Sequence, residues 1–291
     1  MRLVKDALLR IPGVAAVQSR RHGHGTGRMY DPVEVHALFG GHVARLAPHW
    51  SSPFGKTAVE LGPGNSLAQA VLWSLLGAER VLAVDVRRYA TRDSAPEVYR
   101  RVLASVPERI EEGRLPDLLG PEGRSIRTAE LFPDDDFTFP SLGNRIDYRI
   151  TDGDRLPLPD ASADLIYSIS VLEHVRDPAL AYSEMYRVLK SGGLCSHIID
   201  LRDHHHAEPL DFLRYSDPLW RYMAGRSAGW TNRLRASDHL EAIESAGLEI
   251  ASYEPRKLEN IPDPDSLDQR FRRKDSSDLA VAAMILILRK P

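Results

Sequence analysis

The fold of this 291-residue chain is decided by the stretch Thr57-Ala58-Val59-Glu60-Leu61-Gly62-Pro63-Gly64-Asn65-Ser66. A short run of β type leads into two glycines, and a helix is predicted to follow over 67–76. Glycines at a strand-to-helix turn let the backbone approach a ligand closely. The turn lacks the G-x-G-x-x-G spacing of dinucleotide-binding folds. Glu60 beside it would repel a pyrophosphate and would suit a cationic amino group.

Strand-like and helix-like patterns alternate along the rest of the chain. Six more strands are predicted, over 80–86, 145–150, 163–169, 194–201, 248–253 and 279–288. Two more helices are predicted over 178–189, stopped by Ser191-Gly192-Gly193, and over 237–245, capped by Ser237. This alternation predicts an α/β fold with a mostly parallel, doubly wound sheet. Ligands of such sheets bind at the carboxyl ends of the strands.

Three segments exceed what a minimal α/β core needs. Residues 1–55 form an N-terminal extension that we expect to act as a lid. Residues 56–291 form the main domain, with insertions at about 90–142 and 203–236. The run around Tyr30 is rich in histidine and glycine, so it is either a mobile segment that closes over the ligand with Tyr30 as a contact, or a disordered arm.

Two acidic residues follow predicted strands at this ligand-binding edge. Asp85 ends the second strand about twenty residues after the glycine turn, where a carboxylate can accept hydrogen bonds from two ribose hydroxyls. The alternative role for Asp85 is a helix N-cap. Asp152 ends the third strand, where it could accept from the exocyclic amine of adenine while the backbone at Gly153 contacts the ring. The alternative role for Asp152 is a plain polar turn.

A fourth motif follows the next strand and continues through its helix. It comprises Val171-Leu172-Glu173-His174-Val175 and, further on, Arg187-Val188-Leu189-Lys190-Ser191-Gly192-Gly193. Together the four motifs resemble the class I S-adenosylmethionine-dependent methyltransferases, in the subgroup with an LEHV…RVLKPGG signature. The resemblance covers about 56–201 except the insertion and resumes loosely over the last strands. Ser191 stands where proline is usual, which affects only a turn.

The resemblance implies a Rossmann-like sheet of seven strands in which the last strand, predicted over 279–288, runs antiparallel. It implies S-adenosylmethionine as the cofactor. Carried over by position, the residues lining its methionine end would be Glu60, Gly62, Pro63 and Gly64. The contacts to ribose and adenine would be Asp85, Val86, Asp152 and Gly153, and the strand end near the sulfonium would be Ser168 and Ile169.

Candidate catalytic residues cluster after the fifth strand, in Asp200-Leu201-Arg202-Asp203-His204-His205-His206. An oxygen acceptor needs a base to remove its proton, and a neutral histidine suits that role near neutral pH. We therefore take Asp203, His204, His205 and His206 as catalytic candidates. The alternatives are a metal site and solvated or structural histidines. His174 is a further candidate, whose alternative role is to brace the loop after the fourth strand.

Aromatic and arginine side chains concentrate in the second insertion, among them Tyr215, Trp220, Trp230 and Arg233. We expect helical and loop insertions here to form a cap that walls an acceptor pocket. A packed cap without a binding role and an RNA-stacking surface are the alternatives. We predict methyl transfer to an oxygen of a small molecule, a sugar or a specialised metabolite. Carbon or nitrogen methylation, a catalytically silent module that keeps the fold and a nicotinamide dehydrogenase stay open.

Composition agrees with a globular enzyme. Apolar residues make up 43% of the chain and the formal net charge is −3, so we expect no nucleic-acid partner. A single cysteine, Cys195, favours a cytoplasmic setting. The longest apolar run, 279–288, is too short to span a bilayer, so we expect no membrane partner. Either a monomer or a dimer is compatible with this composition.

Overall fold

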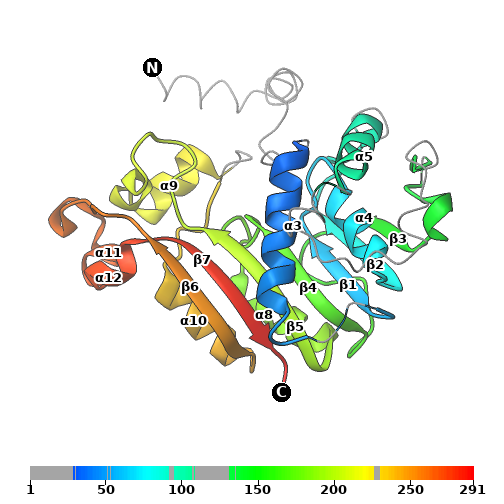
Figure 1. Ribbon diagram of the computed structural model, residues 1–291. Helices are drawn as coiled ribbons and strands as arrows, with labels where there is room; N and C mark the ends of the chain where they lie inside the picture. The colour runs from blue at the N-terminus through cyan, green and yellow to red at the C-terminus, as the bar shows by residue number, and fades with distance from the viewer. Residues whose placement is uncertain are drawn as a thin grey trace.

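A seven-stranded sheet forms the centre of the computed structural model, in the order β3-β2-β1-β4-β5-β7-β6 (Figure 1). The first five strands pair in parallel, whereas β7 is antiparallel to both β5 and β6. The strands are β1 (Thr57–Leu61), β2 (Arg80–Asp85), β3 (Ile146–Ile150), β4 (Ala163–Ile169), β5 (Leu189–Asp200), β6 (Glu249–Lys257) and β7 (Val281–Arg289). The predicted α/β class, the seven strands and the antiparallel last strand are all confirmed.

The structure describes residues 29, 31–50, 52, 54–91, 95–106, 108, 131–134, 136–225 and 230–291. Tyr30 and the histidine-rich run before it lie outside the described residues, as does most of the predicted insertion between β2 and β3. The described part of the N-terminal extension contains α3 (Pro32–Leu46), which begins at Asp31, whose carboxylate accepts a hydrogen bond from the Val33 amide at 3.0 Å. Within these ranges, no helix is both long enough and apolar enough to cross a bilayer.

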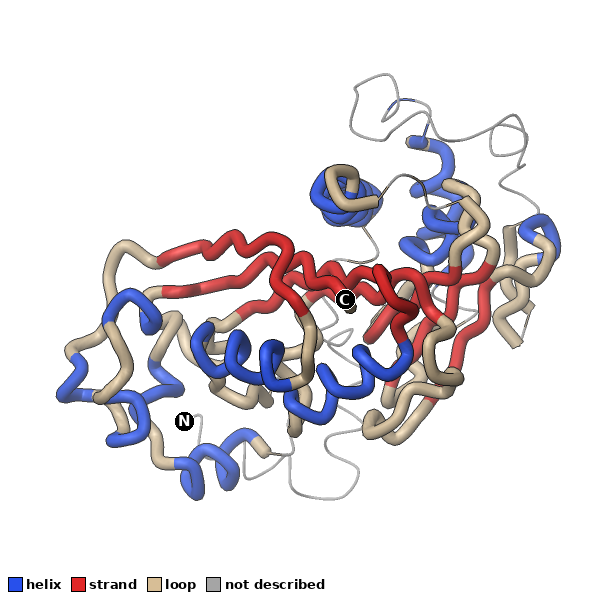
Figure 2. Tube along the Cα trace, turned by 90° about the horizontal axis from the view of Figure 1, so that it is seen from below, coloured by secondary structure: helices blue, strands red, loops and turns tan. Residues whose placement is uncertain are grey.

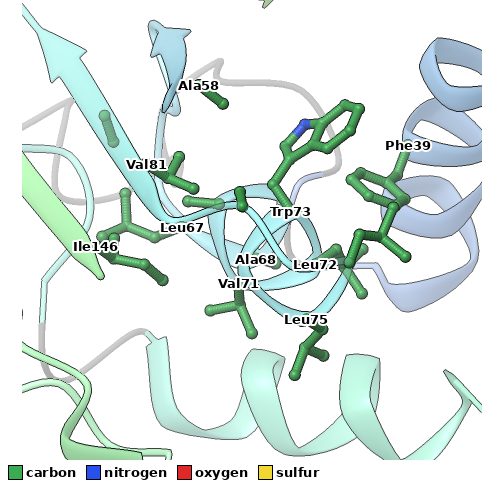
Figure 3. Packing of buried hydrophobic residues seen from close by; sticks show 14 of the residues in the cluster. Phe39, Ala58, Leu67, Ala68, Val71, Leu72, Trp73, Leu75, Val81 and Ile146 are labelled. Atoms are coloured by element: carbon green, nitrogen blue, oxygen red, sulfur yellow. The ribbon is translucent and has the colours of Figure 1, made fainter. Parts of the chain in front are cut away.

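Helices cover both faces of the sheet (Figure 2). One face packs against α3, α4 (Ala68–Leu75) and α5 (Ala95–Ala104), and the other packs against α8 (Pro178–Val188) and α10 (Ala236–Ser245). Successive strand residues alternate between these two cores, as Ala58 and Val59 do. Phe39 of α3 lies beside Trp73 of α4, with ring centroids 4.9 Å apart (Figure 3). This contact seats α3 against the helix that follows the glycine turn.

A third apolar cluster lies beyond the carboxyl end of β5 and forms the cap. It joins the second insertion to the segment between β6 and β7, and its buried members are Leu210, Phe212, Leu213, Trp220, Ala224, Leu267, Phe271 and Leu279. The short helices of the cap are η3 (Asp211–Arg214), α9 (Asp217–Ala224), η4 (Pro264–Ser266), α11 (Gln269–Arg272) and α12 (Ser276–Leu279). A further short helix, η2 (Pro140–Leu142), precedes β3.

Two predicted element boundaries are wrong. The helix expected to stop at Ser191-Gly192-Gly193 ends at Val188, because Leu189 is already extended and pairs with Ala163 of β4. Gly192 instead lies in an irregular part of β5, where its amide donates to the Lys290 carbonyl at 2.8 Å.

Ser237 is not the cap of the next helix. The N-cap of α10 is Arg235, and the amide and hydroxyl of Ser237 bind the carboxylate of Asp278. The helix therefore begins at Ala236, one residue earlier than predicted, and its N-cap lies two residues before the predicted one.

Candidate active site

The glycine turn lies directly against the loop that follows β4. Gly62 and Gly64 have φ angles of +63° and +69°, in the left-handed region that favours glycine. A Cβ atom at Gly62 would lie 2.5 Å from Cγ2 of Val171. Glycine is thus required at position 62 both by its backbone angle and by this close approach. The approach brings the carboxyl ends of β1 and β4 together at the predicted ligand-binding edge.

Glu60 is buried beneath this turn, with 3% of its surface exposed. In the parallel pairing of β1 with β4, Glu60 lies directly opposite Tyr167. Its Oε2 atom has no hydrogen-bond partner. Burial, with the nearby charge of Asp85 as a smaller cause, raises the pKa of Glu60 to about 8. The Oδ1 atom of Asn65, in the same turn, is also buried without a partner.

Asp85 is held at the end of β2 by backbone amides. Its carboxylate accepts from the amides of Val86 at 2.7 Å, Arg87 at 3.2 Å and Gly64 at 3.4 Å. Burial raises its pKa despite these hydrogen bonds. The alternative of a helix N-cap is wrong, because α5 does not begin until Ala95. The carboxylate instead connects the end of β2 to the glycine turn.

An apolar surface adjoins Asp85 at the ends of β2 and β3. Val86 and Ile150 are exposed to 55% and 40%, which is high for aliphatic side chains. Gly153 has a φ of +89°, and a Cβ atom there would lie 2.9 Å from Cγ1 of Val86. Asp152 is exposed, and its Oδ1 accepts from the Asp154 amide at 3.1 Å. The two sequence motifs that predicted ribose and adenine contacts are therefore neighbours in space.

The end of β4 adjoins β1 just before the glycine turn. Ser168 pairs with Leu61, and its buried hydroxyl bonds Nδ1 of His197 at 2.8 Å. The Ser168 side chain is therefore engaged within the fold. Ile169 is the last residue of β4. Ser170 after it has a φ of +52°, which turns the chain toward His174.

His174 and His204 face one another across the site. Nδ1 of His174 lies 2.6 Å from the carbonyl oxygen of Trp230, and since a carbonyl only accepts, this nitrogen carries the proton. The Nε2 atom of neutral His174 then bears the lone pair. Burial lowers the pKa of His174, and this effect outweighs the hydrogen bond to Trp230, which acts in the opposite direction. The two rings are 5.1 Å apart and edge-to-face.

Asp200 connects His204 to the end of β5. Nε2 of His204 is 3.5 Å from Oδ2 of Asp200, and Arg202 binds the same carboxylate through two nitrogens at 2.9 and 2.7 Å. Burial opposes ionisation of Asp200, but the hydrogen bonds from Arg202 and His204 outweigh it and lower the pKa. An ionised carboxylate therefore stands beside His204.

The other catalytic candidates take part in a separate turn. The buried carboxylate of Asp203 accepts from the amides of His205 at 2.7 Å and His206 at 3.1 Å, and from Nδ1 of His206 at 2.6 Å. The rings of His205 and His206 lie against Trp220 and Tyr215 of the cap, each with centroids 5.5 Å apart. The three adjacent histidines thus have different ring contacts, and the ring of His204 is the one described against the ring of His174. Among the described residues, no group of three or more side chains is arranged to hold a metal ion.

Glu173 was not singled out as a site residue from the sequence. It is 1% exposed, and neither carboxylate oxygen has a hydrogen-bond partner. Burial, with the charge of Asp200 as a further cause, raises its pKa to about 8. Its place in the Leu172-Glu173-His174-Val175 motif was the available signal. The burial of Glu173 was not predictable from the motif, because this loop meets a segment almost sixty residues later. In that segment the amide of Asn232 donates to the carbonyl of Glu173.

Comparisons with known proteins agree with this geometry. A family model described as a methyltransferase domain matches residues 128–196. A protein of Mycolicibacterium smegmatis described as an S-adenosylmethionine-dependent methyltransferase is 32% identical over 110 residues, 36% of this chain and 36% of that protein. A demethylmenaquinone methyltransferase of Roseiflexus castenholzii is 28% identical over 167 residues, 53% of this chain and 63% of that protein. In both cases the match spans less than two thirds of the relative's own length.

A solved structure shares the architecture over nearly the whole chain. A geranyl diphosphate methyltransferase in complex with S-adenosylmethionine superposes with a TM-score of 0.51 at 14% identity, covering 98% of this chain and 94% of that one. At this identity the likeness concerns the fold alone. The domain match, the two relatives and the shared fold together make this chain similar to the class I S-adenosylmethionine-dependent methyltransferases.

Proposed function

We propose that the protein binds S-adenosylmethionine and transfers its methyl group to a small-molecule acceptor, with His174 as the base. The observation that carries the proposal is the close approach of Gly62 to Val171, because it joins the glycine turn to the loop that bears His174. The positively charged sulfonium of the cofactor makes its methyl group a strong electrophile. The protein's task is then to hold both reactants in line and to remove one proton.

The residues present fit this cofactor at three points. Glu60 offers a buried oxygen without a partner, which suits the cationic amino group of the methionine part. Asp85, held by three amides, retains lone pairs for ribose hydroxyls. Val86 and Gly153 supply an apolar surface and an exposed backbone for adenine, with Asp152 beside them. Pro63 and Gly64 complete the turn, and the backbone at Ser168 and Ile169 lies next to it.

His174 has the properties that a base requires. Its Nδ1–H donates to the Trp230 carbonyl, which fixes the tautomer and leaves the Nε2 lone pair to accept a proton. Its lowered pKa keeps the ring neutral near pH 7. On proton removal from an acceptor hydroxyl, the oxygen forms a bond to the methyl carbon while the carbon–sulfur bond breaks. The positive charge gained by His174 is then stabilised electrostatically by the nearby carboxylate of Asp200.

The acceptor that we propose is an oxygen of a sugar or another specialised metabolite. Support comes from the polar side chains at the end of β5 and from the cap beside them, where the partly exposed ring of Tyr215 lies on the buried ring of Trp220 with centroids 6.5 Å apart. A partly exposed aromatic ring such as Tyr215 offers an apolar surface with a polar hydroxyl. We propose that the N-terminal extension, residues 1–55, supplies a lid over the cofactor, with Tyr30 as a contact, while its helix α3 stays packed against the sheet.

Carbon methylation is the second candidate. It is favoured by the 28% identity to a demethylmenaquinone methyltransferase. The same base could remove the phenolic proton of an aromatic ring, after which the ring carbon receives the methyl group. The position of a ¹³C-labelled methyl group in the product, read by NMR, separates oxygen from carbon methylation.

Calorimetric titration with S-adenosylmethionine tests the proposal first. Binding in the micromolar range is the expected result, and methyl transfer from the ¹⁴C-labelled cofactor to a panel of sugars and phenols is the second step. Binding without transfer to any acceptor would favour a catalytically silent module. Absence of binding would overturn the proposal.

Replacing His174 tests its role as the base. His174→Ala should lower kcat by roughly 10²–10⁴-fold, the contribution typical of general base catalysis, while the Kd for the cofactor changes less than twofold. His204→Ala should lower kcat less than His174→Ala does, because we expect His204 to affect the reaction only through His174. A larger loss in His204→Ala than in His174→Ala would reverse the assignment.

A further inference from the structure

We propose that Asn232 is the positioning residue for His174, and that it acts by clamping the turn that carries the imidazole. This inference rests on the proposed role of His174 as the base. Asn232 lies in the short segment Trp230–Arg235, which runs between the cap and α10 and which we call the strap. The loop after β4, from Ser170 to Val175, is the catalytic loop.

The contacts of Asn232 hold the catalytic loop at three points. Its side-chain Nδ2 donates to the carbonyls of Leu172 at 2.8 Å and Val175 at 3.1 Å. Its backbone amide donates to the carbonyl of Glu173 at 2.8 Å. These three carbonyls flank His174 on both sides. One residue thus fixes the peptide groups from which the imidazole projects.

The strap also supplies the hydrogen bond that selects the tautomer of His174. That acceptor is the carbonyl of Trp230, two residues before Asn232. A displacement of the catalytic loop relative to the strap would therefore lengthen the Nδ1–H···O bond directly. The clamp by Asn232 and the tautomer of His174 depend on the same local geometry.

The strap is itself anchored to both the cap and the sheet. The buried guanidinium of Arg233 donates to the carbonyls of Phe212 and Tyr215 in the cap and pairs with Asp217. The buried guanidinium of Arg235 donates to the carbonyl of Leu201 at 2.7 Å, at the end of β5, and to those of Leu279 and Val281. The strap is therefore bonded to both the cap and the sheet, and Asn232 connects the catalytic loop to it.

The shape of the strap allows a selective substitution. Oδ1 of Asn232 accepts from the Leu234 amide at 3.0 Å, which stabilises the left-handed backbone at Arg233, φ +62°. Asn232→Asp keeps an oxygen for this turn and keeps the side-chain volume. It replaces the two Nδ2 donors by an oxygen that would repel the carbonyls of Leu172 and Val175. Asn232→Ala removes both the clamp and the turn.

The first readout needs no acceptor. In the wild-type protein, ¹⁵N-imidazole NMR should show His174 as the Nδ1–H tautomer, assigned by the signal that disappears in His174→Gln. In Asn232→Asp this signal should become a mixture of tautomers. The exposed residue Asn260 provides the matched control, because Asn260→Asp adds the same charge and should leave the signal unchanged. An unchanged His174 signal in Asn232→Asp would overturn the positioning role, whatever the activity of the protein.

The second readout is kinetic. Asn232→Asp should lower kcat at least tenfold, with the KM and Kd for S-adenosylmethionine within twofold of wild type. A loss of kcat accompanied by an equal loss of cofactor affinity would show a general disturbance of the site and would overturn the proposal. If the NMR signal changes as expected but kcat does not, His174 is positioned by Asn232 yet is not the base, so the proposed function and not the clamp has failed.

Discussion

At the scale of single residues, local contacts fix the position of Asp85, for which we propose a role in binding ribose. Its carboxylate binds three amides, so its place and orientation are fixed before any ligand arrives. Asp85→Ala should weaken the binding of S-adenosylmethionine at least tenfold, equivalent to ~1.4 kcal/mol, because the ribose contacts and the link to the Gly64 amide are both lost. Calorimetric titration measures the effect.

A matched control for this substitution is Asp154→Ala. Asp154 is an exposed acid in the turn after β3, so its removal subtracts the same charge near the site. Its effect on the Kd should be less than twofold. Equal losses in the two variants would mean that Asp85 acts through net charge alone, and the predicted ribose contact would be wrong.

At the scale of elements, the junction of β1, α4 and β4 depends on one close approach. A Cβ atom at Gly62 would collide with Val171 and would also force an unfavourable left-handed backbone. Gly62→Ala should therefore lower both Tm and cofactor affinity. Val171→Ala in the same chain removes the colliding methyl groups and should restore part of the loss, with the backbone strain remaining.

A double-mutant cycle separates these two causes. Thermal unfolding of the wild type, both single variants and the double variant should give a coupling free energy on the order of 1 kcal/mol, as is usual for residues in contact. Strictly additive effects would contradict a steric cause. The backbone angle of Gly62 would then account for the entire loss.

At the scale of the whole molecule, buried ionisable groups make stability depend on pH. Burial lowers the pKa values of His42 and His197 to about 3 and of His239 to about 4, so these histidines destabilise the fold as pH falls below 6.5. Burial raises the pKa values of Glu60 and Glu173 to about 8. In the folded state these carboxyls keep protons that the unfolded chain releases above about pH 4.5.

The sign of the effect follows from this difference. Between pH 6.5 and 8 the folded chain binds more protons than the unfolded chain at Glu60 and Glu173, so the free energy of unfolding should fall as pH rises. The expected loss is on the order of 1–2 kcal/mol per carboxyl, measured by urea unfolding at pH 6.5 and 8.5. Glu60→Gln with Glu173→Gln should abolish most of this slope. A slope equal to that of wild type would mean that neither carboxyl is protonated in the folded protein.

The sequence by itself determined the architecture of this protein and located the edge of the sheet at which we propose that the cofactor binds. The motifs at this edge lie at strand ends, where a few neighbouring residues dictate the backbone. Each motif could therefore be interpreted by itself. Their residues are Gly62, Gly64, Asp85 and Gly153. Short apolar runs bounded by turn residues likewise predicted all seven strands, because central strands that are buried on both faces are continuously apolar. The predicted N-cap at Ser237 was wrong because Asp278, whose carboxylate binds Ser237, is 41 residues away in the chain.

Only the tertiary structure decided which histidines come together at the candidate site. Sequence proximity grouped His204, His205 and His206, whereas the fold directs the last two to the cap and brings His204 to His174 instead. The burial of Glu173 and the clamp by Asn232 arise in the same way, from a strap that meets the catalytic loop almost sixty residues after it. Such contacts are set by long-range packing of the cap on the sheet, and no local pattern of residues encodes them.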